Sequence, residues 1–199
     1  MFVKDIKKAK KGFYKVTIDD EEYIFSEDTV VKFRMVEGHE TSKEEIALAK
    51  ENEDYSKYYS MAIKYSLRYA KGEASIKAYL LKKGVPLNKA LEIVSRMKEA
   101  KVLNEDSLLD SLIDSMVRSF NGKELIKAKL LQRGFNKEDI KNHLDMIDDN
   151  LYMDCLEKLY NKCKHKYDKY DSYNRIIKIK YYLLQRGYSY SEIDKLTIN

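Results

Sequence analysis

A short phrase recurs three times along this chain, and it constrains the fold more than any other feature. The copies read YLLKKGV, KLLQRGF and YLLQRGY, and their glycines are Gly84, Gly134 and Gly187, which lie 50 and 53 residues apart. A repeat of that length indicates tandem supersecondary units, each of which buries its apolar face against its neighbours. The chain is therefore predicted to contain three similar units in a row.

Each copy of the phrase has the pattern of a helix end. A glycine just past the last turn takes the left-handed backbone conformation without a Cβ penalty. The hydrophobic residue that follows can fold back onto the helix, as Schellman ends commonly do. A cation in the last turn complements the helix dipole by about 0.3–1 kcal/mol. These cations are Lys83, Arg133 and Arg186. End-capping is therefore their first interpretation.

The repeat predicts a mainly α-helical fold: tandem three-helix modules, similar to helix-turn-helix repeats, in an elongated array. One proline and seven glycines favour long regular elements. The expected helices are 55–70, 74–83 and 88–101 in module 1; 105–120, 123–133 and 137–149 in module 2; and 151–167, 174–186 and 191–197 in module 3. The predicted domains are 1–52, 53–104, 105–150 and 151–199.

The first 52 residues have a different pattern. Residues 13–18 and 23–25 are rich in aromatic and β-branched side chains and flank a polar turn, which predicts a β-hairpin. Ser26 is a suitable N-cap for a short helix, and Ser42 with Glu45 makes a capping-box pattern. We expect a small N-terminal domain built of a hairpin and helix.

Caps are also expected at the start of each third helix. Asn136 precedes one such helix, and Ser189 with Glu192 makes a second capping box. Asn88 is the corresponding candidate in module 1.

The charge is distributed unevenly along the chain. The formal net charge is +5, but residues 1–54 carry 10 Lys and Arg against 14 Asp and Glu, whereas residues 55–104 carry 11 against 3. A strongly basic module 1 favours an anionic partner, either nucleic acid or an acidic protein groove. The alternative is that the lysines only keep a helical protein in solution, and the charge alone does not choose between these explanations.

Four stretches, taken in order, carry a family resemblance. They are YYLLQRGYSYSEIDKL at 181–196, NGKELIKAKLLQRGF at 121–135, KVLNEDSLLDSLIDSMV at 101–117 and IDDEEYIFSEDTVVKFRMVEG at 18–38. Together they resemble the RecX family, the bacterial regulators of the RecA recombinase, over nearly the whole chain. The residues that depart from the family's usual pattern are Lys71, Gly72, Ser75, Leu109 and Lys123.

The resemblance implies regulation by binding, without catalysis. RecX-like proteins lie along the helical groove of the RecA filament on single-stranded DNA, and they dampen ATP hydrolysis and strand exchange or alter filament length. The implied partners are the RecA filament and single-stranded DNA, with duplex DNA as a further candidate. Many weak contacts on one elongated chain would raise their effective concentration. We expect a cytoplasmic monomer that does not associate with a membrane.

Basic residues at and near the module ends are the candidate contacts with filament or DNA. They are Lys64, Arg68, Lys71, Lys82, Lys83, Arg133, Arg175, Lys178, Lys180 and Arg186. The first three crowd the end of the first helix in the most basic module. Lys and Arg next to phosphates supply a salt-sensitive attraction. For each of them, solvation or helix capping is the more common explanation.

The chain's seventeen tyrosines raise the question of base stacking. Five of them cluster on the first helix of module 1: Tyr55, Tyr58, Tyr59, Tyr65 and Tyr69. Their spacing of three and four residues is more typical of a packed helix face. We therefore predict core or inter-module packing for this cluster.

A metal site is not expected. Cys155, Cys163 and His165, with His143 nearby, are the only candidate ligands of this kind. Their spacing, C-x₇-C-x-H, matches no common zinc pattern.

The sequence also lacks the common catalytic motifs. It contains no GxxxxGK[ST] phosphate loop, no GxGxxG, no HExxH and no GxSxG. We expect neither an enzyme nor a cofactor. No window approaches about 18 uncharged apolar residues, and the first residues lack the apolar region of a secretory signal.

Two binding functions remain. The first is modulation of a RecA filament, and the second is direct binding of duplex DNA by helix-turn-helix-type modules. A modulator needs the recombinase to show an effect, whereas a duplex binder acts without any partner. A plain scaffold, the third possibility, would show neither behaviour.

Overall fold

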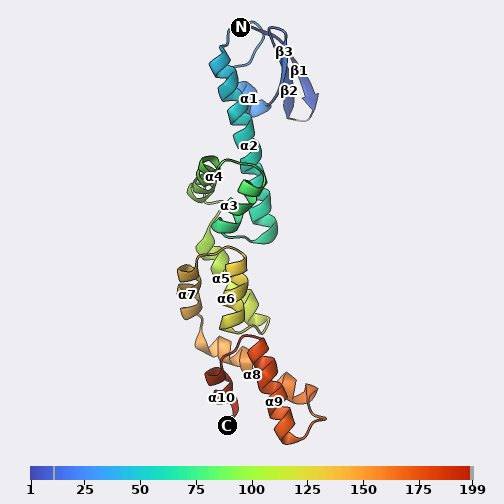
Figure 1. Ribbon diagram of the computed structural model, residues 1–199, viewed down its shortest axis with the longest axis vertical. Helices are drawn as coiled ribbons and strands as arrows, with labels where there is room; N and C mark the ends of the chain where they lie inside the picture. The colour runs from blue at the N-terminus through green and yellow to red at the C-terminus, as the bar shows by residue number, and fades with distance from the viewer. Residues whose placement is uncertain (11, 198–199) are drawn as a thin grey trace.

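The computed structural model describes residues 1–10 and 12–197. Figure 1 shows an elongated molecule with a small sheet at one end, helical layers stacked below it, and the two termini at opposite ends. The predicted mainly α architecture with tandem three-helix modules is confirmed. Within the described ranges, no helix combines the length and apolar character that a membrane span requires.

The N-terminal sheet has three antiparallel strands in the order β1-β2-β3. These are β1 (Val3–Lys10), β2 (Phe13–Ile18) and β3 (Glu21–Ser26). The predicted hairpin is β2 with β3, and it turns at Asp19, whose φ is 49°. β1 is not expected from the sequence, because Val3 and Ile6 are its only β-branched residues among four lysines. Lysines are a common feature of edge strands, where they discourage pairing with other chains.

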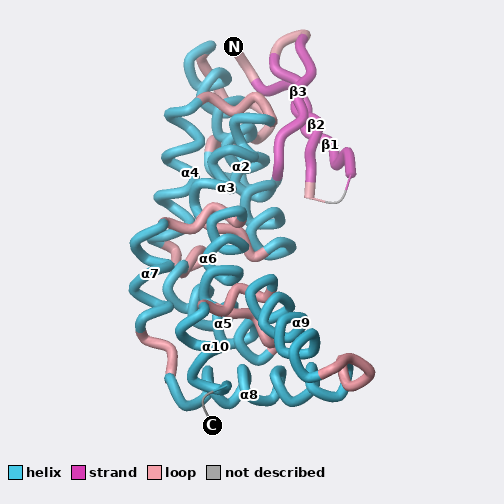
Figure 2. The backbone as a smooth tube through the Cα atoms, turned by 60° about the horizontal axis from the view of Figure 1, so that its bottom comes forward, coloured by secondary structure: helices cyan, strands magenta, loops and turns pink. Residues whose placement is uncertain are grey.

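Two helices follow the sheet: α1 (Glu27–Lys32) and α2 (Lys43–Tyr69). Both predicted caps are present, since Ser26 accepts from Thr29 N–H and Ser42 forms a complete capping box with Glu45. The prediction of a separate helix starting at residue 55 is wrong. Residues 43–69 contain neither glycine nor proline, and one continuous helix passes from the N-terminal domain into module 1 (Figure 2).

Hydrogen bonds fix the N-terminal domain to α2. The Glu53 carboxylate of α2 accepts from the Ser26 backbone N–H at 2.8 Å, from the Ser26 hydroxyl at 2.7 Å and from the Thr29 hydroxyl at 2.8 Å. A carboxylate that accepts several bonds holds both elements in one geometry. The predicted domain boundary at 52/53 therefore lies inside α2, next to the residue that bonds the N-terminal domain.

The remaining helices form the three modules together with the second half of α2. They are α3 (Glu73–Lys82), α4 (Leu87–Glu99), α5 (Glu105–Arg118), α6 (Lys123–Gln132), α7 (Lys137–Asp145), α8 (Asp149–Lys166), α9 (Ser172–Gln185) and α10 (Tyr190–Thr197). Asn136 caps α7, and Ser189 with Glu192 forms the expected box before α10. Asn88 is not a cap, because α4 already begins at Leu87, directly after the N-cap Pro86.

The repeated phrase ends α3, α6 and α9 as predicted. The three glycines have φ values of 82°, 82° and 85°. In α3, Gly84 N–H donates to the Leu81 carbonyl and Val85 N–H donates to the Leu80 carbonyl, which is the Schellman pattern. The same two bonds recur in α6 and α9. The residues after the glycines, Val85, Phe135 and Tyr188, are all buried.

Backbone contacts join successive modules, and no pattern in the sequence predicts them. Gly72 N–H, at the start of α3, donates to the Arg133 carbonyl at the end of α6, with an N–O distance of 2.9 Å. Gly122 N–H, at the start of α6, donates to the Arg186 carbonyl at the end of α9 at 2.7 Å. A Cβ on Gly72 would lie 2.5 Å from the Gly134 carbonyl oxygen. Each junction therefore requires a glycine at a helix start.

The phrase glycines of modules 2 and 3 thus have two roles. Gly134 and Gly187 end their own helices, and they also pack against the start of α3 or α6 in the preceding module. Gly84 differs, because a Cβ added there would meet no atom within 4 Å. Its conformation alone requires glycine.

Buried side chains form three clusters. One lies under the N-terminal sheet around Val16, Ile18 and Phe25. A second belongs to module 1 and includes Ile76 and Leu80. The third is continuous through modules 2 and 3. Modules 2 and 3 therefore share one core, whereas module 1 has its own.

Candidate functional site

Three of the predicted contact residues lie together in an open depression on module 1. Lys64, Arg68 and Lys71 line it, and its volume is about 520 Å³. Lys64 and Arg68 share a face of α2 because they are four residues apart. Ala70 ends α2 with a φ of 46°, and this left-handed residue turns the chain so that Lys71 lies on the same side. The remaining lining residues are Met61, Tyr65, Tyr69 and Tyr79. These seven residues are called the module 1 depression below.

Aromatic rings make much of the wall of the module 1 depression. Tyr65 of α2 stacks on Tyr79 of α3, with ring centroids 4.1 Å apart and an interplanar angle of 1°. Tyr69 lies tilted against Tyr65 at 5.4 Å. The Arg68 guanidinium is 5.2 Å from the Tyr69 ring centroid, and Lys83 Nζ is 5.7 Å from that of Tyr79. Such cation–ring distances are within the range of attraction.

The cations of the module 1 depression are not paired with acids in the part of the chain that the structure describes. Among residues 1–10 and 12–197, Lys64, Arg68 and Lys71 form no ion pair with a carboxylate, and neither do Lys82 and Lys83 at the end of α3. Unpaired like charges gathered over apolar walls create a local positive potential. The depression is therefore suited to an anion that also presents a flat apolar surface.

Arg133 and Arg186 lie at the module junctions. Their carbonyls accept the bonds from Gly72 and Gly122 described above. The Arg186 side chain bonds the Tyr182 hydroxyl at 3.3 Å and lies over the same ring. Both arginines are half-buried. Their backbones have structural roles, and the bond from Gly72 places the Arg133 backbone next to the residue that follows Lys71 of the module 1 depression.

The last three predicted residues lie on α9, and two of them are engaged with acids. Arg175 pairs with Asp168 at 3.1 Å and donates to the Lys164 carbonyl at 3.0 Å. Lys180 pairs with Asp194 at 2.7 Å. Lys178 Nζ lies 4.5 Å from the Tyr170 ring centroid. The structure therefore does not bring these residues together with those of module 1.

The packing prediction for the tyrosine cluster holds for most of its members. Tyr55, Tyr58, Tyr59 and Tyr65 pack against the buried residues of module 1. Tyr69 is different, because 46% of its surface is exposed. Tyr79, on the neighbouring helix, was not singled out by the sequence, although it precedes the leucines of the first phrase. Its place as the first residue of YLLKKGV was the sequence signal that could have identified Tyr79.

The cysteines and histidines have separate surroundings. Cys155 and Cys163 are buried in the shared core of modules 2 and 3. His143 of α7 bonds Asp110 of α5 at 2.7 Å, and it lies 3.5 Å from Asp106. Partial burial opposes the charged form, but the hydrogen bonds with these aspartates raise the pKa of His143 overall. His143 therefore acts as an electrostatic link between two helices.

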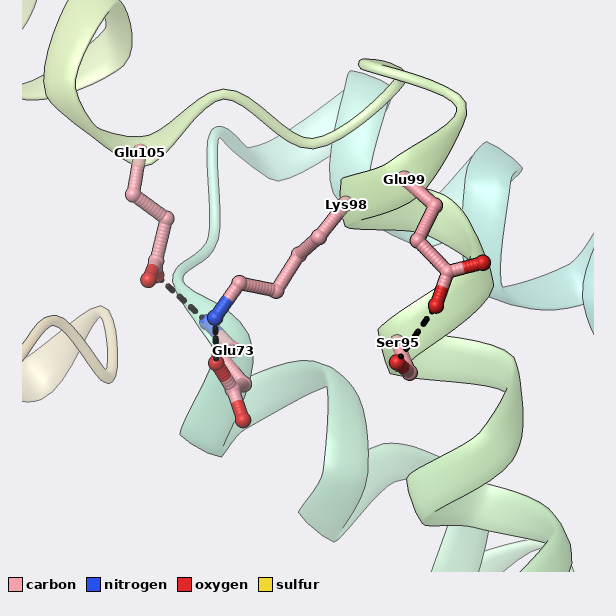
Figure 3. A network of polar contacts seen from close by, with 5 residues as sticks. All are labelled: Glu73, Ser95, Lys98, Glu99 and Glu105. Atoms are coloured by element: carbon pink, nitrogen blue, oxygen red, sulfur yellow. Dashed lines mark hydrogen bonds and ion pairs between the residues drawn. The ribbon is translucent and has the colours of Figure 1, made fainter.

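A carboxylate from module 2 also caps a helix of module 1, as Figure 3 shows. Glu105, in the first turn of α5, accepts from Glu73 N–H at 2.7 Å, and Lys98 pairs with the Glu73 carboxylate at 3.0 Å. Burial raises the pKa of Glu105 above its ordinary value. Because Glu73 opens α3, this bond satisfies one of the orphan donors at the helix start. It adds a side-chain contact to the glycine junction.

Comparison with known proteins points to one family. A family model described as the third three-helix domain of RecX matches residues 151–196. The Regulatory protein RecX of Streptococcus mutans is 27% identical over 188 residues, covering 92% of this chain and 71% of that protein. The Regulatory protein RecX of Enterococcus faecalis is 25% identical over 191 residues, covering 95% and 72%.

Solved structures agree in fold. The crystal structure of a regulatory protein RecX aligns with 100% of this chain and 99% of its own, with a TM-score of 0.77 and 20% identity. RecX from Lactobacillus salivarius aligns with 72% of this chain and 94% of its own, with a TM-score of 0.66 and 23% identity. At these identities the structures show a common fold.

Proposed function

Because this chain belongs to the RecX family, we propose that it binds the filament that RecA forms on single-stranded DNA and inhibits its ATP hydrolysis and strand exchange. The relatives are named as regulatory proteins, which supports a regulatory role for this chain. The proposal goes further by assigning the partner and the direction of the effect.

One observation carries the proposal for this chain: cations that have no acidic partner among the described residues gather on an elongated array of modules. Lys64, Arg68 and Lys71 share one depression, and Lys82 and Lys83 lie at the end of the adjoining α3. A helical filament presents its phosphates and its protein groove repeatedly along its length. An elongated array of modules can bind it through several weak contacts, each of which raises the effective concentration of the next.

The remaining predicted contacts rank below these in the proposal. Arg175 and Lys180 already hold acidic partners within the chain, so a filament contact there would have to compete with Asp168 and Asp194. Exposed ion pairs of this kind contribute little and can exchange partners. Lys178, Arg133 and Arg186 stay as secondary candidates.

The test is ATP hydrolysis by the cognate RecA on single-stranded DNA, titrated with this protein at moderate salt. A fall in rate at a protein-to-RecA ratio well below one supports the proposal. An unchanged rate, together with tight binding of duplex DNA in a mobility-shift assay, would favour the duplex-binding alternative instead.

A charge reversal locates the contact. The double variant Lys64→Glu/Arg68→Glu should require a higher concentration to inhibit hydrolysis, because it places two negative charges where the filament offers phosphates or acids. Its melting temperature should change little, since both side chains are exposed and form no ion pair with the described residues. The matched control is Lys141→Glu/Lys158→Glu, which reverses two exposed lysines on α7 and α8. Equal inhibition by both double variants would exclude the module 1 depression as a contact.

A further inference from the structure

The second leucine of the repeated phrase is not used by the core of its module. In α3 the first leucine, Leu80, is fully buried, and its carbonyl accepts from Val85 N–H at the helix end. Leu81 beside it leaves 42% of its surface exposed. In α6, Leu131 is 43% exposed next to the fully buried Leu130. The phrase therefore places an apolar side chain at the same exposed position in two successive modules.

The exposed leucines belong to a stripe on the second helix of each module. Residues spaced i, i+4 and i+7 share one helix face, and this face lies opposite the buried residues of α3, α6 and α9. The residues of this outward stripe are Ala74, Ala78 and Leu81 in α3; Glu124, Ala128 and Leu131 in α6; and Ile177, Tyr181 and Leu184 in α9. Glu124 is the charged member, and Leu184 is half-buried. The solvent face of a helix is normally polar, so the core does not account for the outward stripe.

Repetition distinguishes the outward stripe from single exposed leucines, which are ordinary on soluble proteins. Leu87 and Leu91 of α4 are also exposed, but the equivalent residues of α7, fifty positions later, are Lys137 and Lys141. Figure 1 shows α3, α6 and α9 one below the other along the array, with α4, α7 and α10 to their left. The outward stripe therefore recurs once per module along the length of the molecule.

A lysine lies one turn before the last residue of the stripe in each module. Lys77, Lys127 and Lys180 occupy this position. In residues 1–10 and 12–197, neither Lys77 nor Lys127 forms an ion pair, whereas Lys180 pairs with Asp194 at 2.7 Å. A surface complementary to the stripe of modules 1 and 2 is therefore apolar at its centre and acidic at its rim.

From this arrangement we propose that the outward stripe binds protein, and that its partner is an assembly of identical subunits, each with an apolar pocket edged by carboxylates. The inference rests on the proposed function, which supplies such a repeating assembly in the RecA filament. Because the stripe recurs once per module, a partner that repeats along its own length can cover several copies at once.

The chemistry of the stripe disfavours two other occupants. A strand of nucleic acid would pair its phosphates with the lysines and leave the apolar centre without a role. Two copies of this chain that joined stripe to stripe would bring their rows of lysines together, and like charges oppose that contact. An acidic protein surface with apolar pockets uses both parts of the stripe.

The experiment measures binding of the labelled full chain to RecA filaments on single-stranded DNA. Leu81→Gln/Leu131→Gln should weaken binding at least about fivefold, the loss expected when side chains that matter to an interface are replaced. Glutamine is a good helix former, so the melting temperature should change little. Leu81→Met/Leu131→Met keeps the apolar contact and should bind as wild type does. The matched control, Leu87→Gln/Leu91→Gln on α4, should also bind as wild type does. Equal binding by the Leu81/Leu131 and Leu87/Leu91 glutamine variants would overturn the proposal.

Two further measurements test the other occupants. Leu81→Gln/Leu131→Gln should bind free oligothymidylate within about twofold of wild type, and an absence of strand binding by both proteins counts the same way. A loss on the free strand equal to the loss on the filament would assign the stripe to nucleic acid. In sedimentation velocity both proteins should behave alike, and a wild-type dimer that the variant loses would assign the stripe to a second copy. Either result would overturn the protein-partner inference.

Module 3 tests whether the contact is repeated. Tyr181 is exposed on α9 at the position of Ala78 and Ala128. Adding Tyr181→Gln to the Leu81→Gln/Leu131→Gln variant should weaken filament binding by a further factor of about three or more, because each lost contact lowers the effective concentration for the rest. No further loss would contradict a contact that recurs in all three modules.

The outcomes also separate this inference from the proposed function. If the wild type inhibits RecA ATP hydrolysis and Leu81→Gln/Leu131→Gln binds and inhibits equally well, the stripe inference is wrong and the regulatory proposal stands. If the wild type binds the filament more tightly than this variant but leaves ATP hydrolysis unchanged, the stripe inference stands and the inhibition is wrong. If the wild type neither binds nor inhibits, both are wrong.

Discussion

Gly122 and Gly84 show how one residue type serves two different needs in this chain. Gly84 has a φ of 82°, so a residue with a Cβ would have a strained backbone there, although the added Cβ would meet no atom within 4 Å. Gly122 is the N-cap of α6 with a φ of −78°, a conformation that any residue adopts. A Cβ there would lie 2.3 Å from the carbonyl oxygen of Gly187. Gly84 is therefore required by its backbone conformation, and Gly122 is required by the close contact between modules.

This difference predicts distinct effects of the same substitution. Gly122→Ala should lower the free energy of unfolding by about 1–3 kcal/mol, the usual cost of overpacking, and should expose the amide of residue 122 to hydrogen exchange because the bond to Arg186 lengthens. Gly84→Ala, the control, should also destabilise the protein, since left-handed strain costs about 1–2 kcal/mol. It should leave the amide of residue 122 protected. Unchanged protection in Gly122→Ala would contradict the close junction.

Of the candidate site, the sequence predicted the cations as contacts and Tyr65 and Tyr69 as packing residues, but it predicted neither the role of Tyr79 nor the way the rings meet. Lys64, Arg68 and Lys71 could be grouped because residues four apart on a helix share a face and Lys71 follows the helix end. The distance between Tyr65 and Tyr79 depends on how α2 crosses α3, which no local pattern determines. The exposure of Tyr69 likewise depends on what the neighbouring helices leave uncovered.

At the scale of elements, helix ends were predicted well and helix continuity was not. Caps such as Ser42 and Ser189, and the glycines after α3, α6 and α9, act within one turn, so the sequence contains their whole cause. The continuity of α2 is a property of tertiary packing. Its middle is held on one side by Glu53, which bonds the N-terminal domain, and on the other by Glu51, which pairs with Lys89 of α4 at 2.8 Å.

The link between α5 and α7 predicts a pH dependence. Aspartates raise the pKa of His143, so its contribution to stability is fully present below the pKa of the unfolded state, near 6.5, and is lost as the pH rises through the folded-state value. His143→Gln should therefore lower the urea midpoint of unfolding more at about pH 6 than at about pH 9.

The matched control for this measurement is His165→Gln on α8. His165 is exposed and forms no ion pair with any carboxylate of the described chain, so the same substitution there should change the midpoint little. A loss in His143→Gln that is the same at both pH values would show that packing, and not charge, links the two helices.

At the scale of the whole molecule, the three modules are similar in shape but not equally coupled. Modules 2 and 3 share a continuous core, whereas module 1 is joined to module 2 by the backbone bond at Gly72 and by the Glu105 cap. The repeat in the sequence predicted equal units. It could not show which cores merge, because side chains at the junctions decide that.

The shared core predicts that a defect in module 3 reaches module 2. Leu183→Ala, a fully buried change on α9, should cost about 2–5 kcal/mol and should reduce hydrogen-exchange protection in α6 as well as in α9. Protection in α3 of module 1 should stay as in wild type, because stability is divided among cooperative units. Loss of protection in all three helices together would mean that the chain unfolds as one unit.

The glycine junctions have a consequence for how such a protein can change over time. The contacts that set the distance from one module to the next are made by main-chain atoms, from Gly72 to Arg133 and from Gly122 to Arg186. Because the carbonyls and not the side chains of those arginines accept the bonds, a change of either side chain leaves the acceptors in place. The array therefore keeps one spacing between modules while its surface residues change, so that related chains can differ in surface contacts and still share the same repeat distance.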